Sequence, residues 1–420
     1  MNRHAIVIGA GLAGSSAAER LAARGWTIDL IDAADSPGRG ASGNLAGVLR
    51  PLPSLDDNRL ARLTRAGFEH ACRHFAALTA SGQALRWAPT GVLHLARDDR
   101  HAATQQLVVE RQQPAADALR FVDREPASRL AGWPVASGGW WFPGGGWVDP
   151  ASLCRANLAQ HATAIRTHYA TEVAQIDRPG DLWRACDAAG ALIAEAPVLV
   201  VANASGARRF AVTAHLPLRA ARGQVSHLGA AAASAPAIVV CRLGYVTPAI
   251  DGVRCVGATF RIDDDETALR DTDHAENLAK LDFILPGYGS ALAASKLDGR
   301  VGFRPLSPDR LPMIGAVGDA SAIDADAPAR PLAEMPRVPG LYVINGFGAR
   351  GIVWSALAGE LLACQIAGEP LPLVDELVSA VDPGRFLLRG RSRRVRTGAE
   401  PSKNDAAAKA PAPTSRGQRD

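Results

Sequence analysis

Three glycines near the start of the chain, Gly9, Gly11 and Gly14, have the spacing of a loop that binds the phosphates of a dinucleotide. An apolar run at residues 5–8 precedes them, and an alanine-rich segment at residues 15–24 follows them. The first glycine permits a tight turn, the second lets the backbone approach a pyrophosphate, and the third lets the helix pack on the strand. The order of strand, glycines and helix therefore predicts a pyrophosphate site.

A second apolar strand is predicted at residues 26–31, and Asp32 follows it directly. An acidic side chain at this place can accept hydrogen bonds from the ribose of an adenosine. The motif does not distinguish FAD from NAD. The alternative interpretation is a glycine turn in an α/β protein without a nucleotide, which the complete order of strand, glycines, helix, strand and acid disfavours.

Two further glycine-rich segments are expected at the same edge of the sheet. Residues 33–47 form a polar loop after the second strand, and residues 345–351 form a turn between a buried strand at 341–344 and a helix at 352–367. In a doubly wound sheet, such loops meet at the carboxyl ends of the parallel strands. The start of the second helix offers free N–H groups and a positive dipole, which suit the negative charge of a reduced flavin. Beside the first glycines and Asp32, the residues expected to contact the cofactor are Leu12, Ala13, Ala41, Ser42, Gly43, Asn44, Gly47, Gly348, Ala349, Gly351 and Ile352.

The composition is that of a globular protein with a large core, since 47% of the 420 residues are apolar and 21% are charged. No apolar run is long enough to predict a transmembrane helix, and the first strand begins too early for a signal peptide. Six scattered cysteines form no CxxC pair, and no His/Cys spacing indicates zinc, so we expect reduced thiols and no metal. A cytoplasmic protein without membrane association is therefore expected.

The remaining pattern indicates two interleaved domains. Helices are expected at residues 58–78 and 149–161, a strand at 171–176, and a hairpin-like aromatic insertion at 138–147. Short strands between residues 219 and 260 indicate an antiparallel sheet. The predicted fold class is α/β (α+β), with a Rossmann-like nucleotide-binding domain interleaved with an antiparallel-sheet substrate domain. The predicted ranges are 1–80, 150–215 and 300–370 for the nucleotide-binding domain, 81–149 and 216–299 for the substrate domain, 371–396 for a basic extension and 397–420 for a disordered tail.

Positive charge is concentrated at the carboxyl end, although the whole chain carries a net charge of only +4. From Arg385 onward there are ten Lys and Arg residues against three Asp and Glu residues. The clustered arginines are Arg385, Arg389, Arg391, Arg393, Arg394 and Arg396. Such a cluster can neutralise the phosphates of a nucleic acid, or it can serve as a solubilising tail, and the sequence leaves both interpretations open.

Several segments, in the same order along the chain, resemble the D-amino acid oxidase superfamily of FAD-dependent enzymes, which includes glycine and sarcosine oxidases. They are Gly9–Gly14, Asp32, Gly244–Pro248, Val256–Thr259, Gly302–Pro305, Asp309–Gly315 and Gly348–Ile352. The resemblance spans nearly the whole folded chain. It implies a fold of the D-amino acid oxidase/glycine oxidase type and a bound FAD.

Within this superfamily, residues 40–52 and 222–227 and the basic end after Pro383 are similar to the FAD domain of the bifunctional enzymes that modify the wobble uridine of tRNA. This resemblance implies oxidative removal of the carboxymethyl group from carboxymethylaminomethyl-uridine, which yields aminomethyl-uridine and glyoxylate. It implies tRNA as the substrate and a separate methyltransferase as a further partner, since the methyltransferase domain is expected to be absent from this chain. Two departures from the family pattern are Arg50, where an aromatic residue is usual, and the tail after Thr397.

The resemblance also implies roles for particular side chains. Arg304 is expected to bind the substrate carboxylate with a bidentate guanidinium, and Tyr245 to hydrogen-bond the same group. Arg350 is expected to contact the flavin O2 or the substrate. The structural alternatives are an ion pair between Arg304 and Asp309, a packing role for Tyr245 and a surface ion pair for Arg350.

Val173 is expected, again by resemblance, to place its backbone against the adenine. No cysteine lies in the turn at residues 346–351, so the FAD is expected to be noncovalent. His227 is a candidate base, with a structural histidine as the alternative. The tryptophans within residues 140–147 either stack on nucleobases or pack in the core.

Three functions follow from these residues. The first is a tRNA-modifying flavoenzyme that oxidises the CH–NH bond of a secondary amine. The second is an oxidase or dehydrogenase of a free amino acid such as glycine, sarcosine or a D-amino acid. The third is a flavin-binding scaffold without turnover. The Ser42–Asn44 loop and the basic end favour the first over the second, and the Arg304–Pro305 pair favours catalysis over the third. The sequence leaves the electron acceptor and the oligomeric state open.

Overall fold

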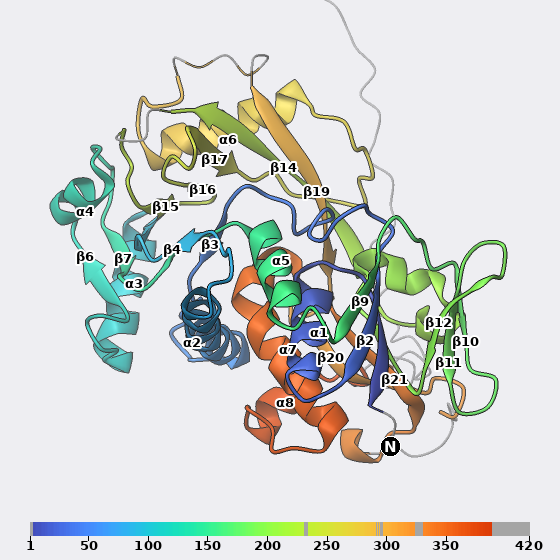
Figure 1. Cartoon of the computed structure of the whole chain (residues 1–420). Coiled ribbons are helices and arrows are strands. Elements are labelled where there is room, and N and C mark those ends of the chain that lie inside the picture. The colour runs from blue at the N-terminus through green and yellow to red at the C-terminus, as the bar shows by residue number, and fades with distance from the viewer. Residues whose placement is uncertain are drawn as a thin grey trace, which may run out of the picture.

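The computed structural model describes residues 3–230, 234–290, 292, 294, 297–323 and 331–388. A six-stranded sheet with the order β20-β21-β13-β1-β2-β9 carries the glycine motif (Figure 1). Its strands are parallel except for β20, which runs antiparallel to β21. They span His4–Ile8 (β1), Thr27–Ile31 (β2), Ile165–His168 (β9), Val198–Val201 (β13), Met313–Gly318 (β20) and Arg337–Asn345 (β21).

Both faces of this sheet are covered, as the apolar runs of its parallel strands require. Alternate residues of β1 divide between the two sides: Ala5 and Val7 pack against helices, and Ile6 and Ile8 pack against a small antiparallel sheet. The helices are α1 (Leu12–Ala22), α2 (Arg59–Ala80), α5 (Pro150–Gln160), α7 (Gly351–Ala367) and α8 (Asp375–Val381). The small sheet consists of β10 (Gln175–Asp177), β11 (Trp183–Cys186) and β12 (Leu192–Ala196), and the short 3-10 helices η1 (Ala204–Arg209) and η2 (Ala211–Thr213) lie beside it.

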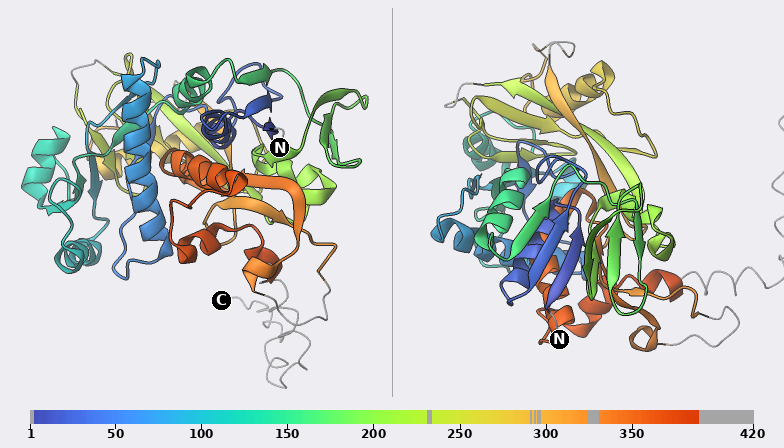
Figure 2. Two further views of the ribbon diagram at one scale, coloured as in Figure 1. Left: turned by 60° about the horizontal axis from the view of Figure 1, so that its bottom comes forward. Right: turned by 45° about the vertical axis from the view of Figure 1, so that its right-hand side comes forward.

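A second, nine-stranded sheet forms the other half of the molecule, and its long strands β14 and β19 extend toward the first sheet (Figures 1 and 2). Helices α3 (Asp99–Gln112), α4 (Arg124–Ala131) and α6 (Asp271–Ile284) lie in this half. The strands are β5 (Val92–Leu95), β6 (Arg120–Val122), β7 (Gly139–Phe142), β14 (Arg219–Gly229), β15 (Val239–Cys241), β16 (Tyr245–Val246), β17 (Val253–Gly257), β18 (Arg261–Ile262) and β19 (Asp298–Leu306). A separate three-stranded sheet has the order β3 (Gly47–Leu49), β8 (Gly146–Val148) and β4 (Trp87–Ala88).

The predicted fold class is confirmed, and several predicted elements coincide with observed ones. Helix α5 begins after Asp149, whose side chain accepts a hydrogen bond from the Ser152 amide, and α7 ends at Gly368 in the left-handed conformation. All six cysteines are free thiols. None of the helices in the described part of the chain has both the length and the apolarity that a membrane crossing requires.

Two predicted elements are wrong in detail. The aromatic segment 138–147 is no hairpin, because β7 pairs with β5 and β6 whereas β8 pairs with β3 and β4. The strand predicted at 171–176 is largely a loop between β9 and β10, because the Thr171 amide bonds to the carbonyl of Asp32 instead of a neighbouring strand.

The division into domains stays a prediction, with one difference in strand pairing. Strand β19 was assigned with residues 300–370 to the nucleotide-binding domain, but it pairs with β14 over nine positions and so belongs to the second sheet. The disordered tail predicted at 397–420 lies outside the described residues.

Candidate active site

A cavity of about 1030 Å³ opens at the carboxyl ends of β1, β2, β13 and β21, and the second sheet supplies its other walls. The structure brings most of the predicted site residues to this cavity. Those that line it are Gly9, Gly11, Leu12, Ala13, Asp32, Ala41, Ser42, Asn44, Gly47, Val173, Tyr245, Arg304, Gly348, Ala349, Arg350, Gly351 and Ile352. Gly14 and Gly43 do not line it, and their contact with a ligand stays a prediction.

The three motif glycines have different surroundings. Gly9 has a φ of +108°, and a Cβ there would lie 2.7 Å from the carbonyl oxygen of Ala202. A Cβ on Gly14 would overlap the carbonyl oxygen of Gly9, which shows how closely helix α1 approaches strand β1. A Cβ on Gly11 would meet only the Ser42 side chain, at 3.1 Å from its Oγ, so the backbone at Gly11 is open toward the cavity. Turn, approach and packing are therefore divided among the glycines as the motif requires.

Two helices begin at the cavity wall. Helix α1 starts after Gly11 and α7 starts after Arg350, and neither start has a side-chain cap. The Leu12 amide donates to the Ser42 Oγ at 3.1 Å, and the other amides of these first turns have no acceptor within their helix. Both helix starts therefore offer N–H groups and a positive dipole to an anionic or electron-rich ligand.

Asp32 holds the glycine turn and faces the cavity. Its Oδ2 accepts from the Ala10 amide at 2.5 Å, and its Oδ1 accepts from the Ala34 amide at 2.8 Å. A carboxylate has acceptor capacity beyond these two bonds, so a ribose hydroxyl can still donate to it. The buried Asn203 Oδ1, also at the cavity, has no hydrogen-bond partner in the structure and is a further free acceptor.

Arg304 enters the cavity from β19, opposite Ala221 of β14. Its Nη1 donates to the Thr259 carbonyl at 3.3 Å, and its guanidinium lies over Gly223, where any Cβ would overlap Nη1. The predicted alternative of an ion pair with Asp309 is wrong, because Asp309 instead accepts from Arg385 at 2.9 and 3.0 Å. None of the ion pairs among the described residues includes Arg304.

Tyr245 lines the same cavity as Arg304 and has an electrostatic effect on it. Burial lowers the pKa of the Arg304 guanidinium, and Tyr245 opposes that shift. Burial raises the pKa of the Tyr245 hydroxyl. At neutral pH the pair is therefore a guanidinium cation beside a neutral phenol, and both groups can donate to one carboxylate.

The same end of the cavity contains further cations. Arg50, Arg97 and Arg350 line it, and no ion pair among the described residues includes any of them. Burial, followed by the charges of Arg50 and Arg310, lowers the pKa of Arg350. The acidic residues of the cavity wall are Asp32 and Glu172, and Glu172 is paired with Arg209. This end is therefore suited to an anionic ligand.

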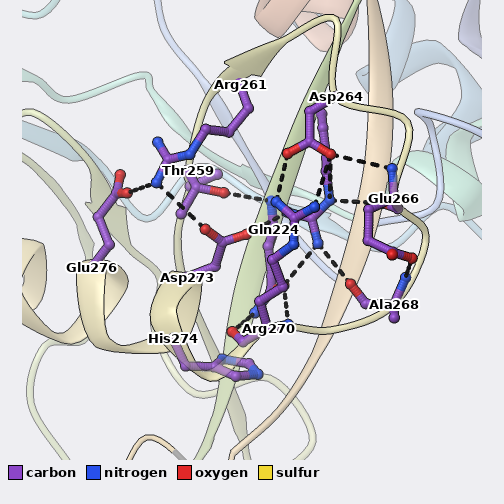
Figure 3. A network of polar contacts seen from close by, with 12 residues as sticks. Gln224, Thr259, Arg261, Asp264, Glu266, Ala268, Arg270, Asp273, His274 and Glu276 are labelled. Carbon is purple, nitrogen blue, oxygen red and sulfur yellow. Dashed lines mark hydrogen bonds and ion pairs between the residues drawn. The ribbon is translucent and has the colours of Figure 1, made fainter.

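A buried polar network holds the segment after Thr259 against β14 (Figure 3). Arg222 is fully buried, pairs with Asp273, and donates to the carbonyls of Glu266 and Ala268 at 2.7 Å each. The backbone amide of Gln224 donates to the Thr259 Oγ1 at 2.9 Å. Because the Thr259 carbonyl accepts from Arg304, the network supports the end of the cavity where the free guanidinium lies.

Comparisons with known proteins identify this architecture. The sequence profile of the family described as FAD dependent oxidoreductase matches residues 4–365. The chain belongs to this family of FAD dependent oxidoreductases. Relatives include the tRNA 5-methylaminomethyl-2-thiouridine biosynthesis bifunctional protein MnmC of Aromatoleum aromaticum, 61% identical over 94% of this chain and 62% of the relative. The protein of the same description from Azoarcus sp. is 57% identical over 92% of this chain and 60% of the relative, so the chain spans about 60% of the length of these relatives.

Solved structures of the same fold include glycine oxidase from Geobacillus kaustophilus, with a TM-score of 0.72 at 18% identity over 90% of this chain and 98% of that one. Iminodiacetate oxidase from Chelativorans sp. has a TM-score of 0.69 at 25% identity over 88% of this chain and 97% of that one. These likenesses confirm the predicted D-amino acid oxidase/glycine oxidase type of fold.

The residues of the cavity fit the FAD of this family. The open backbone at Gly11 and the start of α1 suit the pyrophosphate, Asp32 suits the adenosine ribose, and the start of α7 suits the electron-rich edge of the ring. The turn at 346–351 offers no cysteine, as noted from the sequence. The assignment of each residue to a part of FAD stays a prediction.

One cofactor-side residue was missed by sequence reasoning. Arg300 lies on β19, four residues before Arg304, and its guanidinium donates to the carbonyls of Arg39 and Gly40 and to the Asn44 Oδ1 at 3.3 Å. A Cβ on Gly43 would lie 2.5 Å from the Arg300 Nη2, so the role of this glycine is close packing of the loop on Arg300.

We predict that Arg300→Ala weakens FAD binding by about tenfold. Losing hydrogen bonds from a charged donor costs about 1.5–3 kcal/mol, and we expect part of this free energy to appear as weaker FAD binding because the 39–44 loop is held less firmly. Fluorescence titration of the apoprotein with FAD measures the dissociation constant. Arg120→Ala is the matched control, because Arg120 also donates to a carbonyl, that of Ala116, at an exposed position outside the cavity. Equal affinities for the two variants would contradict the prediction.

For several other candidates the structure favours the structural alternative. His227 lies on β14 outside the cavity, with its Nδ1 3.9 Å from Asp298, so it is no base for a ligand there. Trp140 and Trp141 are only 5% and 8% exposed and do not line the cavity, which excludes them from base stacking. Arg385 is buried in its pair with Asp309, so it is not part of an exposed basic cluster. The other arginines of that cluster lie outside the described residues.

Proposed function

We propose that this chain oxidatively removes the carboxymethyl group from carboxymethylaminomethyl-uridine at the wobble position of tRNA, giving aminomethyl-uridine and glyoxylate. The observation that carries the proposal is the Arg304 guanidinium, which lies without a carboxylate partner in the same cavity as the glycine cradle. The reacting side chain is in effect an N-substituted glycine, so its carboxylate is the anion that this end of the cavity needs. The name of the relatives that are 57–61% identical supports tRNA as its carrier.

When bound, FAD would supply the acceptor for a hydride from the methylene beside the carboxylate, and hydrolysis of the resulting substrate imine would release glyoxylate. The protein fixes the position of that methylene. Arg304 binds the carboxylate in a bidentate manner, and the neutral Tyr245 hydroxyl donates a further hydrogen bond. Because both donors are partly buried and preorganised, the amine loses little freedom in the reaction step.

We propose that Arg350, at the start of α7, stabilises negative charge on the reduced ring or on the substrate. We further propose that a methyltransferase, on another chain or in another domain, uses the aminomethyl product. With tRNA as the substrate, we expect the reaction to take place in the cytoplasm.

The test is anaerobic mixing of the full-length holoprotein with an anticodon stem–loop RNA that carries carboxymethylaminomethyl-uridine. We expect the flavin absorbance near ~450 nm to fall, and mass spectrometry to show aminomethyl-uridine in the RNA. The same RNA with unmodified uridine is the control. Bleaching by free glycine or sarcosine but not by the modified RNA would overturn the proposal in favour of an amino acid oxidase.

A further inference from the structure

Two large apolar side chains are exposed at the wall of the cavity. Phe260 is 47% exposed and Leu243 is 62% exposed, and both line the cavity together with Arg304. They flank adjacent strands, because Leu243 precedes β16 and Phe260 follows β17, and these strands pair Tyr245 with Gly257. Exposed apolar side chains gathered at a cavity commonly mark a binding surface.

The backbone at Leu243 adds a second observation. Its φ is +56°, a left-handed conformation that is unfavourable for a leucine. Such a conformation persists only where surrounding structure imposes it, and it is concentrated at ligand sites. The turn between β15 and β16 therefore keeps a leucine in the cavity wall at a conformational cost.

Phe260 lies close to the group that we assign to the carboxylate. The Arg304 Cζ is 6.0 Å from the centre of the Phe260 ring, and Arg304 donates to the carbonyl of Thr259, the residue just before Phe260. Among the described residues, Phe260 contacts no other aromatic ring. Its ring is therefore available to an aromatic ligand that is held by Arg304.

We propose that Phe260 is the stacking platform for the pyrimidine base that carries the reacting side chain, with Leu243 closing the edge of the base pocket. The proposal rests on the proposed function. In that substrate, only two methylenes and one nitrogen separate the carboxylate from the base. A carboxylate bound to Arg304 therefore leaves the base close to Arg304, within reach of the neighbouring Phe260 ring. Stacking on an aromatic side chain is the usual way in which proteins hold an unstacked RNA base.

The charges around the cavity favour a nucleotide over an apolar protein surface as the occupant. Arg97 lies in the same cavity wall without an acidic partner among the described residues, and a polyanion supplies the missing negative charge. A protein segment would have to be acidic as well as apolar at this point. We therefore assign the apolar pair to the base and the neighbouring guanidinium to the RNA backbone.

The test compares two substrates in each variant of the full-length holoprotein: the modified anticodon stem–loop, and N-ethylglycine, which has the same reacting group but no base. For Phe260→Ala, we expect the half-saturating RNA concentration for flavin reduction to rise by about tenfold. The effect on N-ethylglycine should be at least about fivefold smaller. Phe260→Trp, which keeps a stacking face, should restore most of the RNA affinity.

Ile262→Ala is the matched control, because Ile262 is 45% exposed and lies two residues further on β18 but does not line the cavity. Equal losses for RNA and N-ethylglycine in Phe260→Ala would overturn the proposal, and so would wild-type RNA affinity in that variant. A wild-type protein that is reduced by N-ethylglycine but not by the modified RNA shows instead that the proposed function has failed. If Phe260→Ala changes the sedimentation of the free protein but not the RNA affinity, the surface belongs to a contact between copies of the chain.

Discussion

Replacing Arg304 with methionine is expected to lower kcat/KM for the modified RNA by about 10²–10³-fold. The guanidinium is partly buried and has no carboxylate partner among the described residues. It donates to the Thr259 carbonyl, and its Cζ lies 6.0 Å from the centre of the Phe260 ring. Removing one member of a buried ion pair costs about 3–5 kcal/mol, and each 1.36 kcal/mol corresponds to a factor of ten in rate. The substrate carboxylate would lose its charged partner, and its methylene would no longer be fixed against the cofactor. Steady-state oxidation of the modified RNA measures the loss.

Two controls separate this role from a general effect on folding. Arg304→Lys keeps the charge but not the planar pair of donors, so it should recover only part of the activity. Arg129→Met removes an exposed arginine in an i,i+4 pair with Glu125 and should leave kcat/KM within about twofold. All three proteins should retain bound FAD, because Arg304 lies away from the glycine cradle. If Arg304→Met and the wild-type protein had equal kcat/KM, another group would have to bind the carboxylate.

The cofactor half of the site could be predicted from the sequence because its chemistry depends on the backbone. Gly9, Gly11 and Gly14 are recognisable by spacing, since a turn, a close approach and a helix contact each exclude a Cβ. One further signal was available but unused: Asn203 follows β13 and Asn345 is the last residue of β21, and both line the cavity. Residues at the carboxyl ends of such strands are expected at the ligand site.

The substrate half could be predicted only in part, because its residues come from side chains on a sheet whose pairing is not local. Arg97 and His94 lie in segments whose periodicity says nothing about a cavity, and β5 pairs with β15 almost 150 residues away. The tryptophans were candidate base contacts as well as core residues, but the pairing of β7 with two neighbours buries Trp140 and Trp141. Exposure of Phe260, by contrast, depends on where the β17 strand ends, which no pattern in the sequence marks.

The motif Arg222–Gly223–Gln224 contributed to the family resemblance, and the structure gives it a physical meaning. Gly223 leaves room for the Arg304 guanidinium, where a Cβ would overlap Nη1. The backbone amide of Gln224 donates to the Thr259 Oγ1. The side-chain amide of Gln224 exchanges two hydrogen bonds with the backbone of Arg270, at 2.9 Å each. None of the three residues lines the cavity, so the motif supports the Arg304 end of the cavity from outside it.

The second large effect is expected at the centre of this network, where Arg222→Met should lower the free energy of unfolding by about 3–5 kcal/mol. Arg222 is fully buried and Asp273 is 1% exposed. The substitution removes the buried partner of the Asp273 carboxylate and leaves it only the half-exposed Arg261 guanidinium, 3.6 Å away. The carbonyls of Glu266 and Ala268 also lose their donor. Denaturant unfolding, followed by intrinsic fluorescence and by release of FAD, measures the change.

The peripheral arginine of the same network is the comparison that decides what the burial contributes. Arg261 is 45% exposed, pairs with Glu276 at 2.6 Å and lies 3.6 Å from Asp273, which keeps its Arg222 partner in this variant, so Arg261→Met should cost only about 0–1 kcal/mol. The double variant Arg222→Met/Asp273→Leu should recover part of the stability, because it removes the buried carboxylate together with its buried cation. It should not recover kcat/KM, since the segment from Thr259 to Arg270 would still lack the donors that hold it beside Arg304. Similar losses of stability for Arg222→Met and Arg261→Met would show that the buried pair does not organise this end of the cavity.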